Sequence, residues 1–215
     1  EPAVAEEITF KFLLEASQRA IALQNGEIDV CIDPPTTDLQ FLEEDKNVEV
    51  YIRAGTRLFY MGFNVSKAPF DNQKLRQAVS CAIDKETIID IVLDGRGQWQ
   101  TSVLNRGAWS FLDNDEVEGG YAYDVERAKA LLAEAGYKPG ELTVELVAAT
   151  DDPYKTIAPI IQANLKEIGI NVTIKSMDQA TLKVECANGH QQMFLWRWNI
   201  GARVDETYRE LFYTD

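Results

Sequence analysis

Residues 60–84, Tyr-Met-Gly-Phe-Asn-Val-Ser-Lys-Ala-Pro-Phe-Asp-Asn-Gln-Lys-Leu-Arg-Gln-Ala-Val-Ser-Cys-Ala-Ile-Asp, contain the pattern that decides the fold. Alternation of side chains up to Asn64 predicts a strand. We expect Asp71 to cap the helix that follows, and Asp84 to cap a second helix that ends at Gly95. The first helix has apolar residues at helical spacing: Leu75, Ala78, Val79, Ala82 and Ile83. A strand followed by two capped helices indicates an α/β protein.

The region before this stretch predicts a piece of α/β sheet. Two helices are expected, over residues 17–24 and 36–44, with Pro35 in a position that suits the first turn of the second helix. Alternating or β-branched runs predict strands over residues 8–14, 28–32, 48–53 and 57–64.

The region after it predicts a β-α-β unit. Asp124 is expected to cap a helix that ends at Gly136. A strand over 142–148, an amphipathic helix over 153–168 and a return strand over 170–175 should form a parallel pair with a right-handed crossover. A further helix near 179–187 and a strand over 192–198 follow, whereas residues 95–122 form a long irregular segment.

Length and charge restrict the class of protein. The 215 residues suffice for one large domain or two small ones. A formal net charge of −14 argues against nucleic acid as a partner, because phosphate binding needs clustered lysine and arginine. No apolar run approaches the roughly 20 residues that span a bilayer. The first seven residues are acidic and do not resemble a signal peptide.

Residues suited to catalysis or metal binding are few. His190 is the single histidine, and with Cys186 it offers two metal ligands where a zinc site needs three or four. The chain lacks a Gly-x-Ser-x-Gly nucleophile motif, and its three cysteines do not form a disulfide framework. We therefore expect no enzyme activity, no metal and no cofactor.

An aromatic strand end is the best candidate for a binding site. The run Met193–Trp198 contains two tryptophans and Arg197, and residues 199–205 are predicted to form a turn. In α/β sheets, ligands bind outside the carboxyl ends of the strands. The aromatic residues suit a pocket with apolar walls and one charged group. Alternatively, one tryptophan packs in the core and the other lies on the surface.

Four segments together resemble one family, the extracytoplasmic solute-binding proteins of peptide, nickel and opine ABC transporters. They are the block at 60–84, "ASQRAIALQNGEIDV" at 16–30, "YAYDVERAKALLAEAGY" at 121–137 and "IAPIIQANLKEIGINVTIKSMD" at 157–178. They occur in the family's order along nearly the whole chain. The resemblance implies a binding protein rather than an enzyme.

The resemblance also implies the fold. Such proteins are periplasmic-binding-protein-like (type II, class C), and two lobes, each with a mixed sheet flanked by helices, close on a ligand. Family chains are more than twice this length, so the sequence looks like a partial chain. Residues 1–64 would be part of the first lobe, near the hinge, and residues 65–215 most of the second. The implied location is periplasmic, or at the cell surface with a lipid anchor.

The family resemblance suggests site residues. Trp198 matches the tryptophan that lines the family's pocket, beside Asn199. In peptide binders an aspartate three residues later pairs with the peptide's amino group, but this chain has Gly201, so Asp205 is a candidate substitute. Arg197 stands where the family often has glycine. Its guanidinium could hold a carboxylate or stack on Trp198.

The function implied by the resemblance is capture of a peptide or peptide-like solute and its delivery to an ABC permease in the membrane. The missing aspartate at Gly201 leaves open a receptor for a nickel chelate, an opine or an oligosaccharide. A sensory module that uses the same fold without transport is a further alternative.

Overall fold

The computed structural model describes residues 5–53, 55–104, 111–112, 120–199 and 204–212. The chain divides into two compact units, Glu1–Ala54 and Gly55–Asp215.

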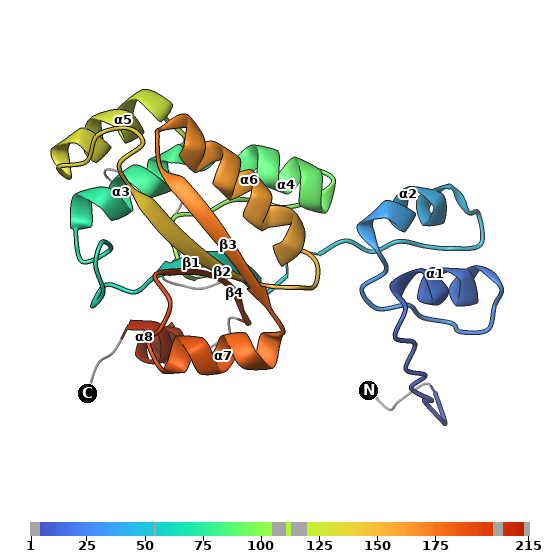
Figure 1. Ribbon diagram of the computed structural model, residues 1–215. Helices are drawn as coiled ribbons and strands as arrows, with labels where there is room; N and C mark the ends of the chain where they lie inside the picture. The colour runs from blue at the N-terminus through green and yellow to red at the C-terminus, as the bar shows by residue number, and fades with distance from the viewer. Residues whose placement is uncertain (1–4, 54, 105–110, 113–119, 200–203, 213–215) are drawn as a thin grey trace. The chain divides into compact units, whose positions relative to one another are not determined.

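A four-stranded mixed sheet forms the centre of the second unit (Figure 1). Its strands are β1 (Arg57–Phe63), β2 (Thr143–Ala149), β3 (Asn171–Met177) and β4 (Met193–Asn199), in the order β1-β4-β2-β3. β2 is parallel to both β3 and β4, whereas β1 is antiparallel to β4. The predicted parallel β-α-β pair is therefore confirmed, and its two strands align from Thr143 opposite Asn171 to Ala149 opposite Met177.

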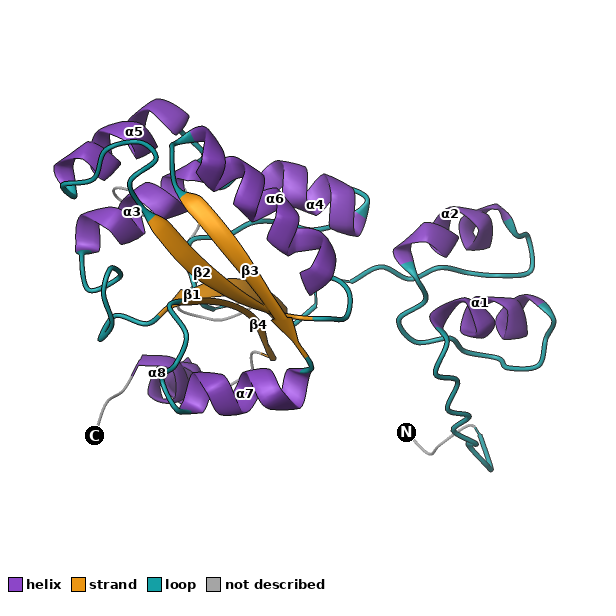
Figure 2. Cartoon of the chain, viewed as in Figure 1, coloured by secondary structure: helices purple, strands orange, loops and turns teal. Residues whose placement is uncertain are grey.

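Helices cover both faces of this sheet (Figures 1 and 2). On one side lie α3 (Gln73–Ala82), α4 (Lys85–Leu93), α5 (Val125–Glu134) and α6 (Tyr154–Glu167). On the other side lie α7 (Gln179–Ala187) and α8 (Val204–Phe212). The core between these layers includes Phe70, Leu75, Leu132, Leu146, Leu165 and Met193, each less than 2% exposed.

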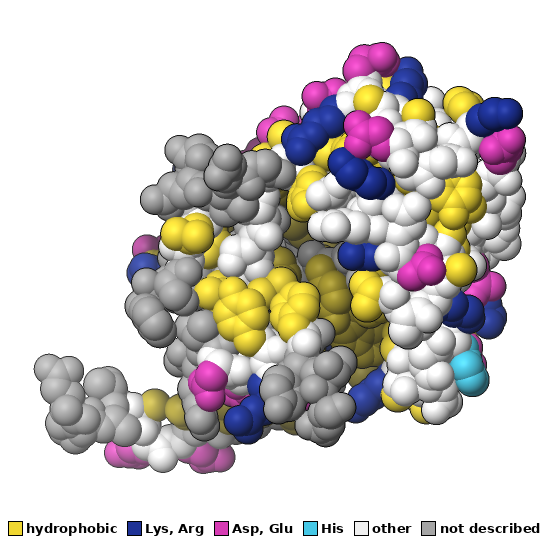
Figure 3. Space-filling view, turned by 90° about the vertical axis from the view of Figure 1, so that its left-hand side faces the viewer, with side chains coloured by type: hydrophobic (Ala, Val, Ile, Leu, Met, Phe, Trp, Pro, Cys, Tyr) yellow, Lys and Arg dark blue, Asp and Glu magenta, His cyan; other side chains and the backbone are white. Residues whose placement is uncertain are grey.

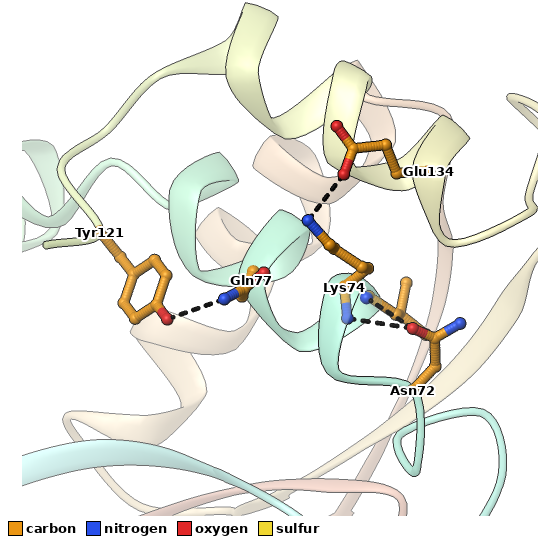
Figure 4. Close-up of polar contacts among 6 residues, drawn as sticks. Asn72, Lys74, Gln77, Tyr121 and Glu134 are labelled. Atoms are coloured by element: carbon orange, nitrogen blue, oxygen red, sulfur yellow. Dashed lines mark hydrogen bonds and ion pairs between the residues drawn. The ribbon is translucent and has the colours of Figure 1, made fainter. Parts of the chain in front are cut away.

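Asn72, not Asp71, caps α3. Its side-chain oxygen accepts from the backbone N–H groups of Lys74 (3.0 Å) and Leu75 (3.4 Å), as Figure 4 shows. The prediction for Asp71 was wrong by one residue, because the helix begins at Gln73 and the cap must directly precede it. The Asn72 amide also donates to the backbone carbonyl of Ala135, at the end of α5.

Two further contacts in Figure 4 hold α3 in place. The Lys74 ammonium lies 2.7 Å from the carboxylate of Glu134 on α5, and the Gln77 amide donates to the hydroxyl of Tyr121 at 3.2 Å. Both members of the ion pair are about half exposed, so it adds little stability. The apolar contact between α3 and α5 is therefore the main attachment, and the Asn72 bonds align the two helix ends.

Replacing Asn72 with alanine should lower the free energy of unfolding by about 1–2 kcal/mol, because the N-terminal N–H groups of α3 lose their acceptor. The matched control is Asp71→Ala, which leaves the cap intact and should change stability by less than about 0.5 kcal/mol. Chemical denaturation of both variants measures the difference. Equal losses in the two variants would show that Asn72 is not the cap.

The first unit contains α1 (Ala16–Gln24) and α2 (Thr36–Glu44), which contact each other. The Arg19 guanidinium donates to the backbone carbonyls of Leu13 (2.9 Å) and Asp33 (3.1 Å) and so joins the two segments beside α1. Both helices were predicted, and α2 has the expected bounds.

The strands predicted over residues 8–14, 28–32 and 48–53 are wrong: the structure has no strand there. Strands need a partner backbone for their N–H and C=O groups, and these segments find none within the part of this unit that is described. Their apolar side chains are correspondingly exposed, including Phe12 at 90% and Leu14 at 95%. Local alternation alone predicted strands that lack a sheet to join.

Elsewhere the sequence predicted the elements to within two residues, with one omission. The helix α8 was not predicted, and its first two residues, Val204 and Asp205, fall in the segment that was expected to form a turn. The expected boundary at residue 64 also differs from the observed one at 54, since β1 pairs along its length with β4 of the second unit.

Candidate functional site

The carboxyl ends of β2, β3 and β4 meet at one edge of the sheet, because these three strands are parallel. Asp151 follows β2, and its carboxylate accepts a 2.6 Å hydrogen bond from the amide of Gln179, which follows β3. Trp198 and Asn199 end β4 at the same edge. This is the edge at which open α/β sheets bind ligands.

The pairing of β1 with β4 divides the side chains at this edge between two faces. Directly opposite pairs are Arg57 with Asn199, Leu58 with Trp198, and Phe59 with Arg197. Because successive strand residues point to opposite faces, Arg57, Phe59, Arg197 and Asn199 share one face. We call this the α6 face, because the ring of Phe59 meets that of Tyr154, the first residue of α6, edge-on at 5.9 Å.

The opposite face, the α7 face, is aromatic. Tyr60 and Phe194 meet edge-on with centroids 6.0 Å apart, and Trp196 lies opposite Tyr60. Gly62 makes room for the ring of Phe194, since a Cβ there would lie 2.3 Å from it. Trp196 packs against the core, whereas Trp198, which is half-buried, lies at the end of this face. Figure 3 shows hydrophobic side chains around a recess on one side of the molecule.

The Tyr60 hydroxyl stays protonated throughout the physiological range. Burial, with smaller contributions from nearby Cys186 and Tyr154, raises the pKa of Tyr60 to about 12. Burial and the neighbouring Glu185 likewise raise the pKa of Cys186 to about 11. These groups therefore offer neutral donors beside the aromatic side chains, not a thiolate nucleophile.

The structure does not bring all five predicted site residues together. Trp198 lies on the α7 face, while Arg197 and Asn199 lie on the α6 face, so the alternative in which Arg197 stacks on Trp198 is wrong. Asp205 is exposed in the first turn of α8, not in a turn before it. Gly201 lies outside the described residues.

Sequence reasoning missed Arg57, Asp151 and Tyr154 as neighbours of the predicted residues. Arg57 is far from Arg197 in sequence, and only the antiparallel register of β1 on β4 brings them to one face. Asp151 precedes the helix expected over 153–168, where capping alone accounts for an acidic residue. The signal that could have found it is its place directly after a buried parallel strand.

The residues first considered for metal binding or catalysis do not assemble. Nδ1 of His190 lies 3.5 Å from the carboxylate of Glu185, and the imidazole is exposed. The described part of the chain contains no group of three or more histidine, cysteine or acidic side chains placed to hold a metal ion. Among the helices that the structure describes, none has both the length and the apolar character needed to cross a membrane.

Comparison with known proteins places these features in a family. All 215 residues match the middle region of the bacterial extracellular solute-binding proteins, family 5. The chain belongs to this family. Its members are binding proteins and not enzymes, and the family is extracellular by description. The resemblance seen in the four sequence segments is thus confirmed.

Individual relatives agree with this assignment. The chain is 32% identical over 198 residues to heme-binding protein A of Haemophilus influenzae and 31% identical over 196 residues to the dipeptide-binding protein of Escherichia coli. These matches cover 90% and 89% of this chain but only 36% of each relative. The chain therefore spans little more than a third of the length of the curated relatives.

A solved structure confirms the fold class. The periplasmic binding protein DppA of Helicobacter pylori, in complex with the peptide STSA, superposes with a TM-score of 0.79 at 26% identity. The match covers 94% of this chain and 38% of that protein. The mixed sheet with helices on both faces is thus part of a periplasmic-binding-protein fold.

Proposed function

We propose that this chain is part of the substrate-binding component of an ABC importer that captures peptides or peptide-like solutes and delivers them to a membrane permease. The observation that carries the proposal is the aromatic strand end, with Trp196 and Trp198 on β4, at the ligand-binding edge of a sheet of this fold. The bound peptide named for the H. pylori relative and the dipeptide-binding relative in E. coli support peptides as the solute class.

The mechanism follows from two lobes and a hinge. The first compact unit, Glu1–Ala54, would contribute to the first lobe, and the second unit, Gly55–Asp215, would contribute to the second lobe. Solute contacts that exist only when the lobes are closed shift the equilibrium toward the closed form. That form then docks on the permease, and no bond in the solute is broken.

Within the second lobe, we assign Trp198 as an apolar wall for the solute. Its ring is half-buried and stands outside the packed core, so it has surface left to cover a ligand. Asn199, at the end of the same strand, offers amide hydrogen bonds on the α6 face. Asp205 lies on α8, on the same side of the sheet as α7, where its carboxylate is suited to an amino group.

A second candidate solute is haem, because a relative with 32% identity is a heme-binding protein. The aromatic α7 face suits a flat apolar ligand as well as a peptide side chain. Nickel chelates, opines and oligosaccharides stay as further alternatives. The proposed location is the periplasm or the outer cell surface, with a lipid anchor in the second case.

A thermal-shift screen of the complete protein that contains this chain tests the proposal. Free solute at 100 times its dissociation constant stabilises the folded state by about 2.7 kcal/mol, so a true ligand should raise the melting temperature by several degrees. The panel contains di- and tripeptides, N-acetylated peptides, haem, nickel–histidine, octopine and maltooligosaccharides.

Stabilisation by free peptides supports the proposal, and stabilisation by N-acetylated peptides as well would show that the amino group is not recognised. Stabilisation by haem alone, or by one of the other solutes alone, would replace peptides with that solute class. If no compound in the panel has an effect, the assignment as a receptor for these solutes fails.

A further inference from the structure

The α6 face contains two guanidinium groups close together at the ligand edge. Arg57 on β1 lies directly opposite Asn199 on β4. Phe59, two residues after Arg57, lies directly opposite Arg197. Arg57 and Arg197 are thus diagonal neighbours on one face, with side chains that start about 7–8 Å apart. Both residues and Asn199 are exposed.

The phenol of Tyr154 borders the same patch. The side chain is only 2% exposed and its ring packs on Phe59. Burial is the main effect and raises the pKa of Tyr154, while Arg197 and Arg57 act to lower it and Asp151 acts to raise it. Both guanidinium groups are therefore close enough to the hydroxyl to interact with it electrostatically.

Local acidic groups do not neutralise Arg197. It has no hydrogen bond or ion pair with any residue that the structure describes, although the chain has 35 acidic and 21 basic residues. Asp151, whose charge also acts on Tyr154, accepts a 2.6 Å hydrogen bond from the amide of Gln179. Two guanidinium groups at this spacing are close enough for both to donate to one anion.

We propose that Arg57 and Arg197, with the Asn199 amide beside them, bind a carboxylate of the captured solute. This inference rests on the proposed function and adds a specificity to it. The planar guanidinium donates two parallel N–H bonds to a carboxylate, and a second guanidinium satisfies the lone pairs that remain. The carboxylate is a peptide's C-terminus, or in the alternative receptor the carboxylate of an opine.

In a chain with a formal net charge of −14, these two arginines form a local positive site on the α6 face. Trp198 on the opposite face would contact a different part of the solute. The end of β4 thereby contributes an apolar contact on one face and a charged contact on the other.

The test compares free acids with amides in the complete protein. An equimolar mixture of dipeptides competes with the same mixture as C-terminal amides, and native mass spectrometry measures the ratio of bound acid to bound amide. Loss of one charge-assisted interaction changes affinity by about tenfold or more, so the wild-type protein should favour acids by at least that factor. Arg197→Gln should reduce this preference by about fivefold or more.

Lys183→Gln is the matched control. Lys183 is an exposed cation on α7, on the other side of the sheet, so its loss changes net charge equally without touching the α6 face. It should leave the ratio of acid to amide unchanged. Arg57→Gln should act in the same direction as Arg197→Gln.

Different outcomes separate the two proposals. If the wild-type protein binds dipeptide acids and amides equally, or if Arg197→Gln behaves like Lys183→Gln, the carboxylate site is refuted while the receptor function stands. If no dipeptide binds but octopine does, and Arg197→Gln abolishes octopine binding, the carboxylate site stands and the peptide assignment fails.

Discussion

Gly169→Ala is expected to lower the free energy of unfolding by about 2–5 kcal/mol, since two separate penalties add at this position. Gly169 ends α6 and turns the chain into β3 with φ +86, a left-handed conformation that L-residues adopt at a cost of about 1–2 kcal/mol. In addition, a Cβ there would lie 2.6 Å from Cα of Pro139, which is backbone and cannot rotate away.

The turn at Gly169 has little freedom to relax. Its carbonyl accepts a 2.7 Å hydrogen bond from the N–H of Gly140. Two residues later β3 begins, and the N–H of Asn171 donates to the carbonyl of Leu142. A shift away from Pro139 would therefore break contacts between β2 and β3. Urea denaturation of the variant measures the loss as a lower midpoint.

Gly136→Ala is the matched control for Gly169→Ala. Gly136 has a similar φ of +92 after α5, but nothing lies within 4 Å of the position that its Cβ would occupy. Only the conformational penalty applies, so the expected loss is about 1–2 kcal/mol. If the two variants lose the same stability, the close approach of Gly169 to Pro139 does not contribute.

Trp198→Ala is expected to weaken solute binding by about 30-fold or more, because a central aromatic contact typically contributes at least about 2 kcal/mol to a binding interface. Trp198 is not among the residues that form the core or pack against it, so the fold should lose little stability. Equilibrium titration with the best dipeptide from the thermal-shift screen measures the affinity.

Trp196→Ala separates binding from folding. Trp196 shares the α7 face with Trp198 but packs against the core, so its truncation should reduce the melting temperature clearly. Trp198→Phe should recover part of the affinity through its remaining aromatic area. An unchanged affinity in Trp198→Ala would remove Trp198 from the site.

The sequence predicted elements well where caps, periodicity and burial agreed. Asp84 and Asp124, both predicted as caps, each accept a hydrogen bond from the N–H three residues on, and their helices begin directly after them. The four strands of the second unit were located because each contains an apolar or alternating run bounded by a helix or a turn in the expected order. In these regions local and long-range forces favour the same structure.

Prediction failed where the outcome depended on partners distant in sequence. The alternating segment from Ile8 to Leu14 has strand-like chemistry, but its state depends on whether another strand lies beside it. The same limit applies to the site. Arg197 and Trp198 are adjacent in sequence yet serve opposite faces, and Arg57 joins Arg197 only through the register of two strands 130 or more residues apart.

The most direct test of the account is equilibrium binding of an isotope-labelled dipeptide mixture to the complete protein, followed by denaturation and mass spectrometry of what is released. A solute-binding protein of this family should hold one dipeptide per chain and release it chemically intact. Absence of bound dipeptide at millimolar concentration, or release of free amino acids in its place, would contradict the proposal that this protein captures peptides without changing them.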